Sequence, residues 1–494
     1  MVSTTQPEAT IESADSPRNA LWWLLLITLG ALALRLYRLG QRPFWLDEAY
    51  SLQITDQPIS SIWSWTNPAA PVDPPLYFVA LRAWRLAFGD AEAAVRSLSV
   101  LFGVTLIPAT YWLGAQLRSK ATGLLAAGLV ALAALQIDHA QTARMYGLLA
   151  LAVTVATAGT VQLMRAKGGR WWVWAGLVAG SAAALLTHAY GVFYVAGLVV
   201  APVWIYRREL MSPFMRRWWI AQGVVLALWA TWIPALPGQF ASYLRLAPSA
   251  FEDPHPLDIA RNLFTTVATG VSALLRTTAA SQVLSVVLGL ILLYIGIRGI
   301  GSLAREPKAV ALGELALGVG VPIVLTLLVG PLVLGRTLVP AGVLALALLA
   351  AGAMSWEGRM RWLIAASLIG LLAVGGMYYS IYGDNDPWDQ AAAFVEAEAG
   401  PDDVVVFIYA DGILPFELYY EPQGVGPTLL PVADADIPRL GELTRGVERV
   451  LLVRSHTPIH DTEGEAPIIL GRLRPQEQMQ DLSGITIYVF GPEG

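Results

Sequence analysis

The sequence predicts an all-α polytopic membrane protein with a small C-terminal α/β domain outside the membrane. Hydrophobic residue types make up 55% of the 494 residues and charged types 14%, whereas a soluble domain carries about 25% charged residues. Residues 384–494 hold 20 Asp and Glu against 6 Arg, while the rest of the chain holds 17 acidic and 26 basic residues. These two observations exclude a soluble enzyme and a disordered chain, and indicate one part in lipid and one acidic part in water.

Eleven apolar stretches have about the length of 20 residues that crosses a bilayer. They follow a polar N-terminus, residues 1–19, that we expect to be disordered. Together they form a membrane domain over residues 20–383. The predicted spans are residues 20–37, 95–117, 121–137, 145–164, 171–187, 189–206, 218–236, 279–297, 310–330, 332–353 and 362–380.

The positions of the basic residues predict the orientation, because cytoplasmic loops are enriched in Lys and Arg. With a cytoplasmic N-terminus, all three lysines, Lys120, Lys167 and Lys308, fall on the cytoplasmic side with the arginines of the short loops. An odd number of spans then places the acidic domain on the opposite side. We therefore expect a multi-pass protein of the cell (plasma) membrane whose C-terminal domain is extracytoplasmic.

Three segments outside the membrane are long enough to carry structure. The outer loops are predicted at about residues 38–94 and 237–278, and the first contains an amphipathic stretch, Tyr77–Phe88. The C-terminal domain, residues 384–494, reads as a small α/β module. Its predicted elements are a helix at Trp388–Ala399 and strands at Val404–Ile408, Val450–Val453 and Ile485–Phe490.

Asp47 and Glu48 are adjacent acids among apolar rings just after the first span. Neighbouring helical residues point about 100° apart, so one acid could face a cavity while the scaffold holds the other. Apolar surroundings raise the pKa of a carboxyl group toward the range of a general base. The alternative is a solvated acid pair or a helix N-cap. Asp73, before two prolines, has the same two interpretations: a site residue, or the N-cap of a helix starting at Leu76.

Basic residues on the outer side oppose the usual charge bias and need an explanation. Arg144 lies in a short outer turn with Tyr146, and it could bind an anion or pair with Asp138. Arg336 stands at the outer end of a span, where it could bind an anion or extend to lipid phosphate. His188 lies at the outer break between two spans, where a histidine is usually a hydrogen-bonding residue.

The combination of these motifs resembles a known family. Trp45-Leu46-Asp47-Glu48, Pro74-Pro75-Leu76-Tyr77, Ala143-Arg144-Met145-Tyr146-Gly147, His188-Ala189-Tyr190-Gly191 and Gly335-Arg336-Thr337-Leu338-Val339-Pro340 occur in this order. Over residues 20–380 the pattern is similar to the polytopic GT-C glycosyltransferases, in particular the protein O-mannosyltransferases and the aminoarabinose transferase of lipid A (glycosyltransferase family 39).

This resemblance implies transfer of a sugar from a polyprenyl-phosphate donor to an acceptor hydroxyl on the outer face, with inversion at the anomeric carbon. It implies that Asp47 is the catalytic base and that Glu48 orients the base or the substrate. It places Arg144, Tyr146, His188 and Arg336 around the donor phosphate or its sugar, with Asp73 beside them. Relatives often have His or Glu-Lys where this chain has Val72-Asp73, which leaves a metal site without clear support.

The expected partners are the polyprenyl-phosphate sugar, an acceptor protein, lipid or glycan, and the bilayer, with no nucleic acid. No cofactor is expected: arginines stabilise the charge of a leaving phosphate, so a divalent metal is compatible with the site but not required. The main alternative is a polytopic lipid or sugar transporter or flippase, which would place ionisable groups near the bilayer midplane. A structural membrane protein with an acidic docking domain would not need Asp47 or Arg336.

Overall fold

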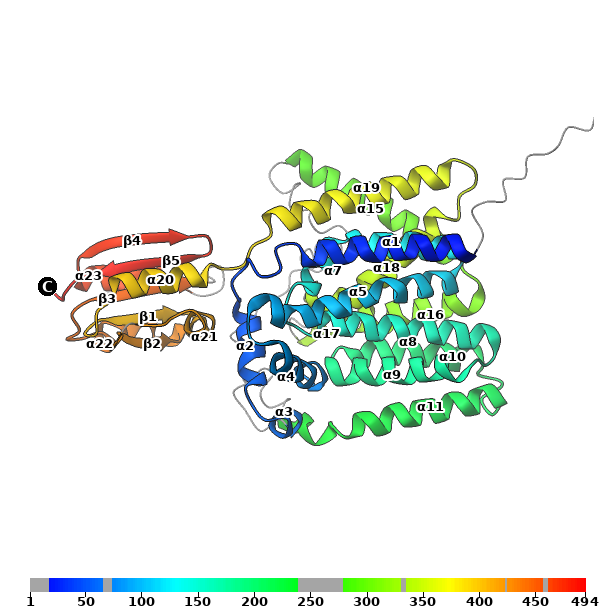
Figure 1. Ribbon diagram of the computed structural model, residues 1–494, viewed down its shortest axis with the longest axis horizontal. Helices are drawn as coiled ribbons and strands as arrows, with labels where there is room; N and C mark the ends of the chain where they lie inside the picture. The colour runs from blue at the N-terminus through cyan, green and yellow to red at the C-terminus, as the bar shows by residue number, and fades with distance from the viewer. Residues whose placement is uncertain (1–16, 65–72, 239–278, 330–334, 423, 456–460) are drawn as a thin grey trace, which may run out of the picture.

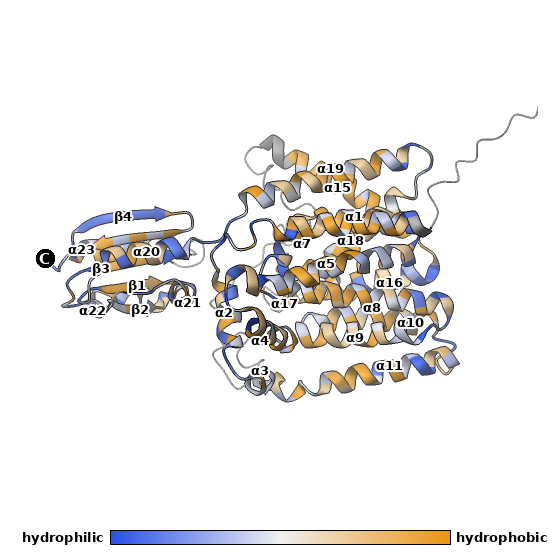
Figure 2. Cartoon of the chain, in the orientation of Figure 1, coloured by the Kyte–Doolittle hydropathy of each residue, from blue (hydrophilic) through white to orange (hydrophobic). Residues whose placement is uncertain are grey.

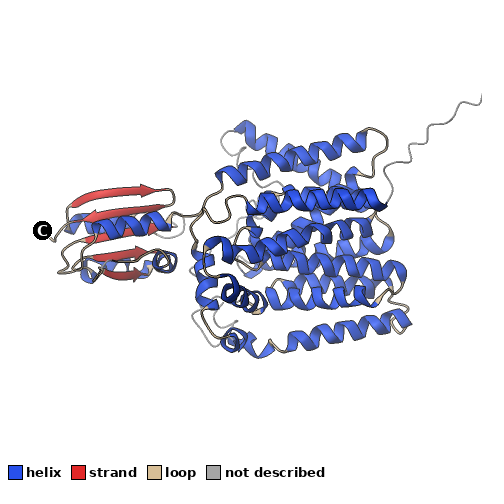
Figure 3. Cartoon of the chain, in the orientation of Figure 1, coloured by secondary structure: helices blue, strands red, loops and turns tan. Residues whose placement is uncertain are grey.

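The chain consists of a bundle of helices and a smaller domain built on a sheet, which lie end to end in Figure 1. The computed structural model describes residues 17–494 apart from 65–72, 239–278, 330–334, 423 and 456–460. Residues 1–16 of the predicted disordered N-terminus, 1–19, lie outside the described residues. Almost all of the predicted second outer loop, 237–278, also lies outside them. All described strands lie in the C-terminal domain (Figure 3).

The bundle is made of long helices that run side by side (Figure 1). Their bounds are α1 (Pro17–Leu36), α5 (Glu92–Leu117), α6 (Lys120–Leu132), α7 (Ala134–Ala140), α8 (Tyr146–Ala166), α9 (Trp171–Thr187), α10 (Gly191–Ile205), α11 (Pro213–Ala230), α15 (Ala279–Gly301), α16 (Arg305–Leu315), α17 (Val321–Val329), α18 (Val339–Ala353) and α19 (Met360–Tyr382). Short turns of helix complete the bundle: η1 (Ile233–Ala235), the π-helical η2 (Ala316–Gly320) and η3 (Gly335–Leu338). Apolar residues line these helices along most of their length (Figure 2).

Each predicted span coincides with a described helix or a pair of helices, but the number of crossings is only partly supported. Seven described helices are long and apolar enough to cross a bilayer, with α16, η2 and α17 counted as one. The pair α6 and α7, bent by 64°, would be an eighth. Helices α9 and α10 are apolar but only 17 and 15 residues long. The fold class is confirmed, and the count of eleven spans remains a prediction.

Small residues allow the helices of the bundle to pack closely. A Cβ atom added to Gly180 of α9 would lie 2.6 Å from the carbonyl oxygen of Ala152 in α8. A Cβ atom on Gly197 of α10 would lie 2.7 Å from the carbonyl oxygen of Gly313 in α16. Because lipid removes the hydrophobic drive between helices, such close backbone contact supplies much of the packing energy.

Three short helices lie at the end of the bundle that faces the C-terminal domain (Figure 1). They are α2 (Leu46–Thr55), α3 (Ile59–Ser64) and α4 (Leu76–Phe88). Helix α4 confirms the predicted amphipathic helix, and its Tyr77 is fully buried with its hydroxyl 2.9 Å from the Ser99 hydroxyl of α5. Arg82 of α4 donates a hydrogen bond to the carbonyl of Thr55 at 2.6 Å. These contacts fix α2 to the bundle.

The C-terminal domain contains a five-stranded mixed sheet in the order β2-β1-β3-β5-β4, with helices on both faces. Its elements are α20 (Trp388–Glu398), β1 (Val404–Ile408), η4 (Ala410–Gly412), α21 (Ile413–Glu417), β2 (Thr428–Val432), η5 (Asp434–Arg439), α22 (Leu440–Leu443), β3 (Val450–Ser455), α23 (Glu465–Leu473), β4 (Gln476–Leu482) and β5 (Ile485–Phe490). Strand β1 is parallel to β2 and β3, whereas β5 is antiparallel to β3 and β4. The predicted helix and three strands are confirmed.

Candidate active site

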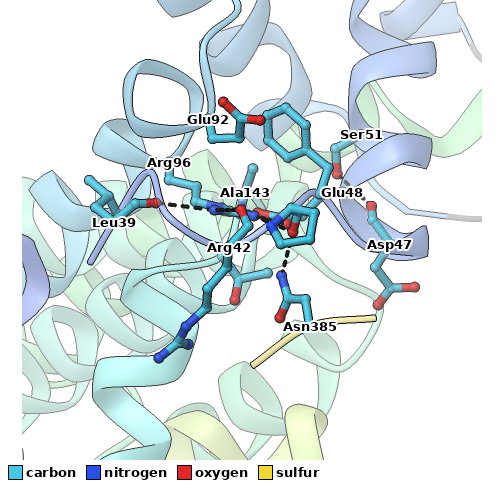
Figure 4. A network of polar contacts seen from close by, with 12 residues as sticks. Leu39, Arg42, Asp47, Glu48, Ser51, Glu92, Arg96, Ala143 and Asn385 are labelled. Carbon is cyan, nitrogen blue, oxygen red and sulfur yellow. Dashed lines mark hydrogen bonds and ion pairs between the residues drawn. The ribbon is translucent and has the colours of Figure 1, made fainter. Parts of the chain in front are cut away.

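Helix α2 presents Asp47 and Glu48 in its first turn, where carboxylates are favoured by the helix dipole. The two side chains point in different directions, as the helical geometry requires. Figure 4 shows the Glu48 carboxylate inside a polar network and the Asp47 carboxylate pointing away from it. The two acids therefore have different environments and are considered separately.

Glu48 is fully buried and forms a two-pronged ion pair with Arg96 of α5. Arg96 Nε donates to Glu48 Oε1 at 2.8 Å, and Arg96 Nη2 donates to Oε2 at 2.6 Å. The backbone N–H of Ala143 also donates to Oε1 at 2.8 Å. The remaining donors of Arg96 bind the carbonyls of Leu39, Arg42 and Pro43 (Figure 4). Glu48 thus joins α2, α5 and the turn that carries Arg144.

Asp47 forms an ion pair with Arg336, which lies 289 positions away in the sequence. Arg336 Nη1 donates to Asp47 Oδ2 at 2.5 Å, and Arg144 Nε lies 3.9 Å from the same oxygen. The side chain of Asp47 retains 15% exposure and that of Arg336 retains 34%. The predicted base and both predicted anion-binding residues therefore meet at one carboxylate that is still open to solvent.

Asp73 and His188 surround Arg144 on its other side. Arg144 Nη2 donates to Asp73 Oδ2 at 3.2 Å, and His188 Nε2 lies 3.9 Å from Asp73 Oδ1. Asp73 does not cap α4, because the N-cap residue is Pro75 and forms no side-chain cap. The N-cap interpretation of Asp73 is therefore wrong: its carboxylate is directed to a buried guanidinium.

Arg144 is held by several partners but keeps one donor without a hydrogen bond. Its Nη1 reaches the carbonyl oxygen of Asp47 at 3.3 Å and the hydroxyl of Ser51 at 3.4 Å. Within the described part of the chain, its buried Nε has no hydrogen-bond partner. The alternative pairing with Asp138 is not formed, since Asp138 Oδ1 accepts a hydrogen bond from the Tyr379 hydroxyl at 2.7 Å.

Aromatic rings form the floor under Arg144. The Arg144 guanidinium lies 5.9 Å from the Tyr146 ring centroid, and the rings of Tyr146 and His188 are 5.8 Å apart. His188 Nδ1 accepts a hydrogen bond from the N–H of Tyr190 at 3.0 Å. Burial and the nearby Arg144 lower the pKa of His188, against the opposing effect of Asp73. His188 is therefore a neutral imidazole at neutral pH.

The site offers little for a metal ion. Among the residues that the structure describes, no group of three or more His, Cys, Asp or Glu side chains could hold one. Asp73 and His188 supply only two donors, and Arg144 already occupies one carboxylate oxygen of Asp73. The expectation that no metal is required therefore remains a prediction.

All seven sequence-predicted site residues lie at the end of the bundle that faces the C-terminal domain, whereas two other arginines near this end have separate roles. Arg35 is fully buried, and its guanidinium donates to the carbonyls of Ala31, Val130 and Ala131. Arg42 Nη1 donates to the Tyr379 hydroxyl at 2.5 Å.

Two features of the site were not identified from the sequence. Arg96, the partner of Glu48, is a basic residue at the predicted outer start of a span, and the same charge-bias argument that selected Arg144 could have found it. The second is a cavity of about 340 Å³ beside Trp45. It is lined by Arg42, Trp45, Asp138, Thr142, Tyr379 and residues 383–386.

Part of the chain matches a known family model. The family model described as dolichyl-phosphate-mannose-protein mannosyltransferase matches residues 63–238, which include Asp73, Arg144 and His188. A search of curated protein sequences finds no match.

Three solved structures share the architecture of the chain. ArnT from Cupriavidus metallidurans in the apo state is 14% identical, with a TM-score of 0.57 over 95% of this chain and 98% of its own. The same protein bound to undecaprenyl phosphate has a TM-score of 0.53 at 15% identity, with the same coverage. The Archaeoglobus fulgidus oligosaccharyltransferase is 13% identical, with a TM-score of 0.55 over 94% of this chain and 72% of its own.

The chain therefore has the GT-C fold of membrane glycosyltransferases, as its motifs predict. Within that class, the segment that carries Asp73, Arg144 and His188 is similar to the mannosyltransferases of family 39.

Proposed function

We propose that the protein is a membrane glycosyltransferase that moves a sugar from a polyprenyl-phosphate donor to an acceptor hydroxyl on the extracytoplasmic face. The observation that carries this proposal is that Arg336 and Arg144 both lie at the carboxylate of Asp47. The undecaprenyl phosphate bound to the structurally similar ArnT supports a lipid-phosphate donor. The family match supports a sugar as the transferred group.

Asp47 is the general base of the proposed reaction. A hydroxyl is a weak nucleophile, and a carboxylate that accepts its proton as the bond forms contributes about 10²–10⁴ in rate. The side chain of Asp47 is partly exposed, so an acceptor can reach it. Asp73 has a positioning role, because its carboxylate pairs with Arg144 and lies beside His188.

Arg336 and Arg144 bind the donor phosphate. Arg336 is the more exposed of the two, and the Nε of Arg144 has no hydrogen-bond partner among the described side chains and backbone groups. A phosphate that accepts from both guanidiniums would form charge-assisted hydrogen bonds. As the lipid phosphate departs, these bonds stabilise the negative charge that it gains.

One base and one anion-binding pair favour a single displacement. The acceptor oxygen attacks the anomeric carbon on one side while the phosphate leaves on the other, and Asp47 takes the acceptor proton. The sugar configuration inverts, because no second carboxylate acts as a nucleophile. Glu48 has a positioning role through Arg96, whereas Asp73, Tyr146 and His188 orient Arg144.

Consumption of labelled donors tests the proposed activity. The purified protein in lipid nanodiscs is incubated with undecaprenyl-phosphate mannose, glucose, galactose and arabinose, each labelled in the sugar. We expect one of these donors to be consumed with release of undecaprenyl phosphate. Consumption of none of them would contradict the proposal.

Removal of Arg144 or Arg336 should weaken binding of the donor phosphate. Arg144→Ala and Arg336→Ala should each raise the Kd for undecaprenyl phosphate by about 10-fold to 100-fold, the value of one lost hydrogen bond to a charged group. The Kd is measured by fluorescence titration of purified protein. Arg38→Ala is the matched control, because Arg38 is a half-buried arginine near the same end of the bundle whose hydrogen-bond partners are Gln41 and the carbonyl of Ile381. Unchanged affinity in both variants would show that Arg144 and Arg336 do not bind the donor phosphate.

The proposed face of the reaction can be tested by protease access. An epitope placed after Gly494 should be removed by external protease in spheroplasts, whereas an epitope at the N-terminus should be protected. This result follows from the placement of Lys120, Lys167 and Lys308 on the cytoplasmic side. Protection of the C-terminal epitope together with loss of the N-terminal one would contradict the predicted topology and show the opposite orientation.

A further inference from the structure

The end of the C-terminal sheet that faces the bundle, where the parallel strands have their carboxyl ends, has the geometry of a binding site. Strands β2, β1 and β3 are parallel and adjacent in that order, so the connection from β1 to β2 and the connection from β2 to β3 run in opposite directions along the sheet. In open α/β sheets, ligands bind outside the carboxyl ends of the strands at such a reversal point. Helix α21, which follows β1 closely, packs on α2 (Figure 1). The carboxyl end of β1 is thus directed at the helix that carries Asp47.

Tyr409, the residue directly after β1, has a strained backbone. Its φ of 74° and ψ of 88° lie in the left-handed region, which a bulky residue rarely occupies and which glycine adopts readily. The N–H of Gly412 donates to the Tyr409 carbonyl at 2.9 Å and closes the turn. Strain of this kind concentrates at functional sites, and the retained side chain here is an aromatic ring with a hydroxyl.

Contacts on both sides hold this turn against α2. Tyr50 of α2 lies close to Asp411, and burial together with this carboxylate raises the pKa of the Tyr50 hydroxyl. Tyr50 lies three residues after Asp47, on the same side of α2. The hydroxyl of Tyr419 accepts the N–H of Phe44 at 2.6 Å.

The Tyr409 hydroxyl lies within electrostatic range of the proposed base and its arginine. Burial raises its pKa, Asp411 and Asp47 raise it further, and Arg336 opposes them. Tyr409 is therefore a neutral O–H donor at physiological pH. Asp411 is exposed on the same turn and supplies an acceptor.

On the basis of the proposed function, we propose that Tyr409 and Asp411 form the acceptor side of the active site, where they hold a neutral, hydroxyl-rich acceptor such as a sugar against Asp47. They are positioning residues. A phenol that donates and a carboxylate that accepts match the hydroxyl groups of a sugar. The local net charge of −14 over residues 384–494 disfavours anionic acceptors.

In the resulting step, the acceptor O–H gives its proton to Asp47 as its oxygen bonds to the anomeric carbon. The bond from that carbon to the phosphate oxygen breaks, and polyprenyl phosphate leaves with the electron pair. Water can replace the acceptor in the same step. Because water needs no positioning by Tyr409 or Asp411, the ratio of transfer to hydrolysis reports on their role.

The experiment measures this ratio with the labelled donor that the wild type consumes, and with methyl α-mannoside and a Thr-containing peptide as competing acceptors. Tyr409→Phe and Asp411→Asn should each lower the ratio of transferred to hydrolysed sugar by about five-fold, the effect of one hydrogen bond. The rate of donor hydrolysis and the Kd for undecaprenyl phosphate should stay within about two-fold, because the lost hydrogen bond is made to the acceptor. Tyr488→Phe, the same substitution on β5, should change neither quantity.

Each result has a defined meaning. An unchanged ratio, or an equal fall in transfer and hydrolysis, would overturn the positioning role, and preferred transfer to the peptide would overturn the acceptor class. In both cases consumption of the donor by the wild type leaves the proposed function intact. If the wild type consumes no donor, the proposed function fails and this inference fails with it. Tyr409→Gly, which relieves the backbone strain, should lower the ratio without lowering the Tm and thereby separates positioning from folding.

Discussion

Asp47→Asn should reduce sugar transfer by about 10³-fold, within the range that a general base contributes, while the Kd for undecaprenyl phosphate changes little. The amide has the shape of the carboxylate and its oxygen can still accept from Arg336 at the position now 2.5 Å away. It cannot take the acceptor proton at neutral pH. Transfer is measured with labelled donor in nanodiscs, and donor affinity by titration of the same preparation.

Asp56→Asn is the matched control for this variant. Asp56 is the C-cap of the same helix, and its exposed side chain pairs with Arg85. The same substitution there should leave transfer unchanged. Transfer by Asp47→Asn at the wild-type rate would show that Asp47 is not the general base. A transporter or flippase would instead show movement of lipid that does not depend on Asp47.

Glu48→Ala should lower the free energy of unfolding by about 3–5 kcal/mol, the effect of breaking a buried ion pair. The substitution leaves Arg96 charged and 1% exposed, with backbone carbonyls and the Phe44 ring as its partners among the described residues. It also removes the acceptor for the N–H of Ala143. We expect a marked fall in the apparent Tm of the purified protein, with transfer lost in parallel because α2 is no longer fixed.

Arg439→Ala provides the comparison for Glu48→Ala. Arg439 pairs with Asp436 on the surface of the C-terminal domain, and both side chains are about half exposed. Its loss should change the free energy of unfolding by less than about 1 kcal/mol. A Glu48→Ala variant as stable as Arg439→Ala would show that the Glu48–Arg96 pair does not hold α2.

The membrane fold and much of the site follow from short-range patterns in the sequence. Apolar length predicts the helices, because a span has to satisfy its backbone internally. Arg144 and Arg336 are identifiable because each opposes the charge bias of outer segments. Their meeting at Asp47 is not encoded locally, since Arg336 and Asp47 are 289 positions apart and only the packing of the bundle brings them together.

Other features depend on tertiary contacts that no local pattern reveals. Glu48 and Asp47 are equivalent in the sequence, and they differ because Arg96 of α5 pairs with Glu48 whereas Arg336 pairs with Asp47. The edge strands β2 and β4 were not predicted, because β4 is polar and largely exposed and β2 contains a proline, which sheets tolerate at their edges. The role of Tyr409 depends on how the two parts of the chain meet.

Buried Glu314 of α16 was also not singled out from the sequence. Its carboxylate accepts hydrogen bonds from the Thr157 hydroxyl of α8 at 3.0 and 3.2 Å. It adjoins the π-helical turn η2, a local irregularity that sequence patterns do not indicate. Because the pair joins α8 to α16, we interpret Glu314 as part of the packing of the bundle.

The most direct test of the central claim is the structure of the protein with undecaprenyl phosphate, determined by electron cryomicroscopy in nanodiscs. The account predicts phosphate density within hydrogen-bonding distance of Arg336 and Arg144, with the Asp47 carboxylate facing the open side of the site. A second position for the phosphate serves as the comparison: a groove of about 590 Å³ between α10 and α16, whose lining includes Arg305 and Lys308. Phosphate density in that groove, with Arg336 still paired to Asp47, would contradict the account.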